Sequence, residues 1–134
     1  MAPKRKADIT AAELRIMKIL WDLGPATVRD VKQVLTDEGD KPAYTTVMTM
    51  MKQLAEKGAL HVDKSRQPFV YRPAVQRDRV LGDRIKQFLG TVFNGQAGEL
   101  VLRLIEETNL SPEDLRRIAE KIEKRERSNE KTER

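Results

Sequence analysis

The spacing of the apolar residues first changes in this chain at Gly58. Before Gly58, apolar residues recur every three or four positions, which is the pattern of amphipathic helices. After it, Leu60 and Val62 alternate with polar residues, and so do Phe69 and Tyr71, as they would in half-buried strands. The segment "SRQP" between these two runs is typical of a turn, so the sequence predicts helices followed by a two-stranded hairpin.

Capping signals divide the first part of the chain into separate helices. The Thr10-Ala-Ala-Glu13 pattern is a capping box, and the helix that it begins is stopped by Gly24-Pro25. Thr27 is then predicted to cap a second, shorter helix, with Asp30 at its third position and an end near Gly39.

A third helix is predicted from about residue 43 to residue 57, with Gly58 as its left-handed cap. At 100° per residue, one face carries the apolar residues Val47, Met50, Met51 and Leu54. The opposite face carries Thr45, Met48, Thr49 and Lys52, with Thr46 and Gln53 on its flank. Threonine is a mediocre helix former, but its hydroxyl and methyl groups can contact base edges and phosphates at close range. Exposed Thr and Met are also common on ordinary helix surfaces, so this face alone does not decide the function.

The order of elements makes the nucleic-acid interpretation more specific. Three helices followed by a hairpin are the order of a winged helix-turn-helix, here over residues 9–74, and the fold class predicted is mainly α with a small β-hairpin wing. The wing tip carries Lys64, Arg66 and Gln67, placed to touch the phosphate backbone or the minor groove. The residues predicted to bind DNA are Tyr44, Thr45, Thr46, Met48, Thr49, Lys52, Lys64, Arg66 and Gln67.

Positive charge is concentrated in the first half of the chain. Residues 1–73 contain 13 Lys and Arg against 9 Asp and Glu, whereas residues 74–134 contain 13 against 12. Residues 41–72 contain six basic residues and two acidic ones. This distribution favours a polyanion-binding module joined to a second part with another task.

From Val75 onward the helical spacing of apolar residues returns. The segment "NGQAG" at residues 94–98 interrupts it, either as a hinge between helices or as a loop that presents a protease site, and Ser111-Pro112 begins the last helix. These helices are too short to form a separate core, so we expect residues 75–123 to pair with a second copy and residues 124–134 to be a charged tail that frays. The predicted dimer interface is Leu81, Ile85, Phe88, Leu89, Leu100, Val101, Leu104, Ile105, Leu115, Ile118 and Ile122.

Other chemistry finds little support in the sequence. The chain has no cysteine and a single histidine, His61, so neither a metal site nor a thiol nucleophile is expected. The carboxylate pairs Glu106-Glu107 and Glu113-Asp114 are adjacent in sequence and do not converge on one helix face. We therefore predict no enzyme activity and no cofactor. No apolar stretch is long enough to span a membrane, residues 1–8 are predicted to be a flexible basic arm, and a cytoplasmic location is expected.

Four segments of the chain together resemble the BlaI/MecI/CopY penicillinase-repressor family. They are "ITAAELRIMKILWDLGPATVRDVKQVL", "AYTTVMTMMKQLAEKGAL", "QPFVYRPAV" and "GELVLRLIEETNLSPEDLRRI", and they extend over about residues 9–122. The resemblance implies a homodimeric repressor with an N-terminal winged helix and a C-terminal helical dimerisation region. It further implies that inverted-repeat operators are bound through the third helix and the wing.

The chain also departs from the pattern of that family. Copper-responsive members carry C-terminal cysteines, which are missing here. Members linked to antibiotic resistance are cut at an Asn-Phe bond, in a pathway that begins at a membrane-embedded sensor metalloprotease; Arg103-Leu104 occupies that position in this chain, so cleavage there requires a protease of different specificity. Met48 and Gln53 stand where many relatives have basic residues, which implies a different operator sequence or affinity.

Two functions remain open on the sequence. The first is a dimeric, operator-specific repressor that is released by proteolysis or by another partner. The second is an interaction adaptor that keeps the winged-helix shape without reading DNA. The basic balance of residues 41–72 favours the repressor.

Overall fold

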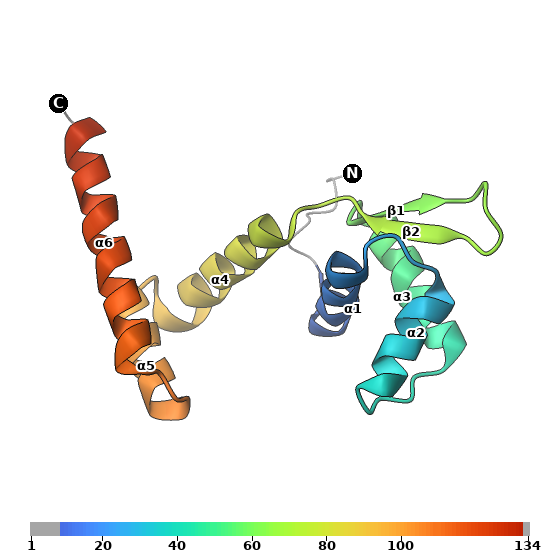
Figure 1. Ribbon diagram of the computed structural model, residues 1–134, viewed down its shortest axis with the longest axis horizontal. Helices are drawn as coiled ribbons and strands as arrows, with labels where there is room; N and C mark the ends of the chain where they lie inside the picture. The colour runs from blue at the N-terminus through green and yellow to red at the C-terminus, as the bar shows by residue number, and fades with distance from the viewer. Residues whose placement is uncertain (1–8, 133–134) are drawn as a thin grey trace. The chain divides into compact units, whose positions relative to one another are not determined.

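The computed structural model describes residues 9–132, which divide into two compact units (Figure 1). The first unit extends to Lys86 and the second begins at Gln87. The basic arm predicted at residues 1–8 and the last two residues of the charged tail lie outside the described residues.

Three helices form most of the first unit, and their starts follow from local capping. Helix α1 (Ala11–Leu23) and helix α2 (Val28–Asp37) each begin with a capping box, in which the threonine hydroxyl accepts from the backbone N–H at the third position and the acid at that position accepts from the threonine N–H. Helix α3 (Tyr44–Glu56) begins without a side-chain cap because alanine precedes it, and Gly58 follows its end with a φ of 83°. The predicted helices are confirmed.

The hairpin consists of strands β1 (Leu60–Asp63) and β2 (Val70–Pro73), paired antiparallel as predicted. Val62 lies opposite Tyr71 in the register, which places the apolar side chains of both strands on the face toward the helices. One further pairing was not predicted: Ala26, in the loop between α1 and α2, exchanges two backbone hydrogen bonds with Tyr71, of 2.8 and 2.9 Å. This pairing ties the base of the hairpin to the helices.

The core of the first unit lies between the three helices and the hairpin. Its most deeply buried side chains come from every helix, and Tyr71 closes it from the hairpin side; they include Ile16, Met17, Leu20, Val31, Val47, Met51 and Leu54. The indole N–H of Trp21 donates to the carbonyl oxygen of Val75 at 3.1 Å, which fastens the segment after β2 to α1.

A buried ion pair joins the start of α1 to the end of α3. The side chain of Glu13 is only 2% exposed, and its Oε1 atom accepts hydrogen bonds from the N–H of Thr10 at 2.9 Å and from Nζ of Lys57 at 2.5 Å. Its Oε2 atom is buried without a hydrogen-bond partner among the described residues. Burial raises the pKa of Glu13, but the hydrogen bonds from Lys57 and Thr10 outweigh burial and hold the pKa below its ordinary value.

The second unit contains the end of α4 (Arg77–Phe93), helix α5 (Ala97–Glu107) and helix α6 (Pro112–Thr132). The predicted break after α4 is formed by Asn94 and Gly95, which adopt positive φ angles of 52° and 78°. None of the described residues of α5 or α6 is buried. No helix between residues 9 and 132 is long and apolar enough to cross a membrane.

Helix α6 is longer than the sequence indicated. We expected the chain beyond Glu123 to be a charged tail that frays, but the helix continues to Thr132. The residues beyond Glu123 are mostly Glu, Lys and Arg, which have high helix propensity. Arg127 also lies 4.0 Å from Glu123, one turn earlier. Propensity and side-chain pairing therefore extend a helix that hydrophobic spacing alone did not predict.

Candidate nucleic-acid interface

The outer face of α3 presents the polar side chains that the sequence placed there. Thr45, Thr46, Thr49 and Lys52 are exposed, while Val47, Met51 and Leu54 on the opposite face are buried. The hydroxyl of Thr49 donates to the carbonyl oxygen of Thr45 at 2.8 Å, so its oxygen keeps free acceptor capacity toward the outside. A helix surface with hydroxyls, methyl groups and one ammonium group can meet both base edges and phosphates.

Both methionines near the edge of this face differ from their predicted environment. Met48 was expected to be exposed and Met50 to be buried, but both are half-buried and pack against the core. Ideal helical spacing could not anticipate the nearby hairpin, whose Phe69 and Tyr71 line the same cavity as Met48. The outer face of α3 around Thr45 and Thr49 is therefore less apolar than expected, because part of Met48 is covered.

The wing tip exposes Lys64, Arg66 and Gln67, as predicted. Asp63 organises this turn, because its Oδ1 atom accepts from the N–H of Ser65 at 2.9 Å and from its hydroxyl at 2.5 Å. These hydrogen bonds, with smaller contributions from Arg66 and His61, hold the pKa of Asp63 below its ordinary value. Arg66 lies 3.6 Å from Asp63, so part of its charge is compensated, whereas Lys64 makes no ion pair within residues 9–132.

A cavity of about 220 Å³ brings the predicted residues of α3 and the wing together. Tyr44, Met48 and Lys52 line it from α3, and Gln67 lines it from the wing. The remaining lining is largely apolar and consists of Val28, Pro68, Phe69 and Tyr71. Four of the nine predicted residues thus border one depression, which has an apolar floor and a polar rim.

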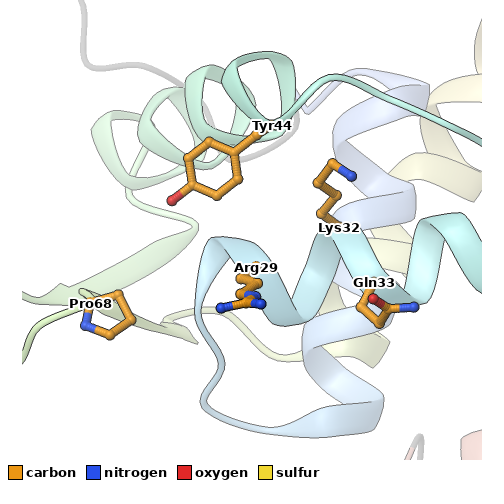
Figure 2. A pocket seen from close by; sticks show the side chains of 5 residues that line it. All are labelled: Arg29, Lys32, Gln33, Tyr44 and Pro68. Carbon is orange, nitrogen blue, oxygen red and sulfur yellow. The ribbon is translucent and has the colours of Figure 1, made fainter.

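A larger cleft of about 630 Å³ adjoins this cavity and adds residues that the sequence reasoning missed (Figure 2). It is lined from α2 by Arg29, Lys32 and Gln33, and across from them by Tyr44 and Pro68. A usable indication was present in the sequence, because an inward stripe of Val28, Val31 and Leu35 turns Arg29 and Lys32 outward. The residues predicted to bind DNA lie only on the third helix and the wing, so α2 adds a third element to this surface.

The predicted interface residues of the later helices are largely uncovered in the single chain. Leu81, Leu89, Leu100 and Val101 are half-buried, and the exposed ones are Ile85, Phe88, Leu104, Ile105, Leu115, Ile118 and Ile122. Arg103, the first residue of the candidate cleavage position, is exposed in α5 and forms ion pairs with Glu106 and Glu107. His61 is exposed, and no group of three His, Asp or Glu side chains suited to a metal ion occurs in the described part of the chain.

Sequence comparison relates this chain to known regulatory proteins. A family profile described as penicillinase repressor matches residues 9–124. The penicillinase repressor of Bacillus licheniformis is 29% identical over 120 residues, which cover 90% of this chain and 93% of that protein. The methicillin resistance regulatory protein MecI of Staphylococcus aureus (strain N315) is 24% identical over 118 residues, covering 88% of this chain and 95% of that protein.

A solved structure of the Bacillus licheniformis BlaI monomeric form in complex with the blaP half-operator is 31% identical to this chain in sequence. The match covers 53% of this chain and 85% of that chain, with a TM-score of 0.45.

The fold is that of a winged helix-turn-helix protein, because three helices precede a two-stranded hairpin and the third helix has a polar outer face. The predicted fold class is confirmed. The profile match covers nearly all of the described residues. The chain therefore belongs to the penicillinase repressor family, as its resemblance implied.

Proposed function

We propose that this protein is a homodimeric, sequence-specific transcriptional repressor that binds inverted-repeat operators through α3 and the wing. The main observation in support of this function is the exposed row of Thr45, Thr49 and Lys52 on α3, a helix held in place by its buried opposite face. Membership in a family of repressors supports the same function, and it gives no support to an enzyme.

The two elements contribute differently to binding. Side chains of α3 reach base edges in the major groove, where short hydroxyls and methyl groups discriminate between base pairs. Lys64 and the other polar residues of the wing tip contact the sugar-phosphate backbone, which fixes the register of the protein on the duplex. The protein represses by occupying the operator, so it acts where the chromosome lies, in the cytoplasm.

The dimer rests on the apolar side chains of α4, α5 and α6. Phe88 is 50% exposed and Ile122 is 55% exposed in the single chain, and no residue of α5 or α6 is buried within the described helices. A second copy would cover these side chains by a two-fold symmetric contact. Two recognition helices joined in this way would meet half-sites about one helical turn apart, ~34–36 Å centre to centre.

Release from DNA would follow from damage to this dimer. Cleavage between Arg103 and Leu104 would divide α5 in the middle of its apolar surface. The two DNA-binding units would then lose the higher DNA affinity that they have when they are linked in one dimer. Proteases bind extended backbone, so α5 must unwind locally before it can be cut. The inducing pathway would include a protease that accepts an Arg-Leu bond, acting downstream of a membrane-embedded sensor metalloprotease.

The test is a selection on genomic DNA. Full-length protein is incubated with sheared genomic fragments at near-physiological salt, and the bound fragments are sequenced, with Thr49→Ala as a matched variant on the reading face. We expect an inverted repeat with half-sites one turn apart, recovered less efficiently by the variant. A folded dimer that recovers no motif would refute the repressor and support the adaptor.

A further inference from the structure

We propose that the cleft between α2, the start of α3 and the wing tip holds operator phosphates, with Arg29 and Lys32 as the residues that neutralise them. This inference rests on the proposed function, because it names a further part of the DNA contact. It extends that contact from α3 and the wing to α2, and it assigns DNA binding to two side chains that the sequence reasoning had not selected.

The shape of the surface supports this assignment. Tyr44 and Pro68 line both the cleft of about 630 Å³ and the smaller cavity beside Lys52, so the two depressions adjoin each other; together they are called the groove. In Figure 2 the side chain of Lys32 extends from α2 toward the start of α3. A nucleic-acid strand that contacts Lys52 on α3 would enter this groove and pass along α2.

The charges in the cleft also favour an anion. Arg29 and Lys32 line it, and no carboxylate belongs to its lining. Of the two acidic side chains of α2, Asp30 accepts from the N–H of Thr27 at 3.0 Å, and Asp37 accepts from Nε2 of Gln33, which lines the cleft, at 2.9 Å; neither forms an ion pair with Arg29 or Lys32. Neither Arg29 nor Lys32 forms an ion pair with a carboxylate within residues 9–132. Both cations are thus available to an external anion.

The cleft suits a phosphodiester backbone better than a base or a small apolar ligand. Its lining offers two cations and a phenol, which are donors to phosphate oxygens, and it lies beside the surface on α3 that we expect to read base edges. Arg29 can donate two parallel hydrogen bonds to one phosphate, while Lys32 acts as a point charge. Contacts of this kind raise affinity for every DNA sequence and carry no sequence information of their own.

Salt dependence tests the proposal directly. The affinity of the full-length protein for the selected operator and for an unrelated duplex is measured across a range of salt concentrations, with Arg29→Gln and Lys32→Gln as variants. Each lost phosphate contact should reduce the slope of log affinity against log salt by about 0.9, or about 1.8 for a dimer. At 0.1 M salt this corresponds to roughly 60-fold weaker binding, equal for both duplexes.

Two controls separate a phosphate contact from a general loss of charge. Lys18→Gln removes an exposed cation of α1 that lines neither depression, and it should leave the slope unchanged. Arg29→Lys keeps the charge and should restore most of the slope while losing the paired hydrogen bonds. Circular dichroism melts should be the same for all variants, because neither side chain belongs to the core.

A neutral methylphosphonate, introduced at one operator phosphate at a time, locates the contact. At the phosphate that Arg29 holds, Arg29→Gln should cause no further loss of affinity, whereas at every other phosphate it should cause its full loss. If wild-type protein selects an operator but neither Gln variant changes the slope, the cleft is not a phosphate site and the proposed function stands. If inorganic phosphate at constant ionic strength shifts the Arg29 side-chain resonance and the DNA slopes stay equal, the cleft binds free anions and the proposal is overturned.

Discussion

Replacing Lys57 with methionine should destabilise the first unit chiefly through the charge of Glu13. Methionine keeps most of the aliphatic stem but removes the ammonium group that donates to Oε1 of the buried carboxylate. Glu13 would retain only its hydrogen bonds with Thr10, while its Oε2 atom already lacks a partner among the described residues. Removing one partner of a buried ion pair costs ~3–5 kcal/mol. The lower end, about 3 kcal/mol, applies because the Lys57 side chain is 18% exposed.

The dependence on pH distinguishes this charge effect from lost packing. In the wild type the pKa of Glu13 is lowered, so its contribution is fully present above the unfolded pKa and is lost as pH falls through the folded pKa. In Lys57→Met burial dominates and the pKa of Glu13 rises above its ordinary value. The deficit in unfolding free energy should therefore be largest at pH 7 and shrink toward pH 4, where protonation removes the unpaired charge.

The assay is urea unfolding followed by the fluorescence of Trp21, the single tryptophan of the chain, which is bonded to Val75 within the first unit. Glu13→Gln and the double variant Glu13→Gln/Lys57→Met complete a cycle that isolates the pair. Thermal unfolding followed by the same fluorescence should show a midpoint temperature lowered by about 12–24 °C for Lys57→Met, from ~4–8 °C per kcal/mol in a unit of this size. An equal deficit in unfolding free energy at pH 7 and pH 4 would refute this reasoning. It would show that the loss comes from the packing of the aliphatic part of Lys57.

Three further outcomes are expected. Thr27→Ala should lose about 1 kcal/mol of unfolding free energy through its capping box, measured by urea unfolding, and a change below experimental error would show that α2 does not depend on its cap. Thr49→Ala should weaken operator binding by about 1 kcal/mol or more while unfolding changes by less than about 0.5 kcal/mol; an unfolded variant would contradict its outward position. Leu104→Glu should convert the dimer to monomers in light scattering, and a tight dimer would remove this residue from the interface.

The features that the sequence predicted well are local ones. The capping boxes at Thr10 and Thr27 and the left-handed residue at Gly58 each depend on a few neighbouring residues, so the three helices and the hairpin could be derived without tertiary information. The outward positions of Thr45 and Thr49 followed from helical spacing in the same way.

The features that the sequence did not predict depend on contacts between distant segments. Glu13 was assigned only to its capping box, yet it also binds Lys57, 44 residues later. Met48 was expected to be exposed, because helical spacing does not reveal that the hairpin folds back beside it. The sequence did not indicate a role for Arg29 and Lys32, because the cleft that they line forms only when α2, α3 and the wing come together.

The two backbone hydrogen bonds between Ala26 and Tyr71 fix the wing at its base and leave its tip projecting. The base of the wing is also held in place because Tyr71 is buried and the backbone N–H of Ala74 donates to the carbonyl oxygen of Ala59 at 2.8 Å. The turn beyond Asp63 projects past this attachment, so a small tilt at the base would produce a larger displacement at the tip. A substitution at Pro25, which lines a depression together with Asp63 and Arg66, should therefore change the position of Arg66 at the wing tip.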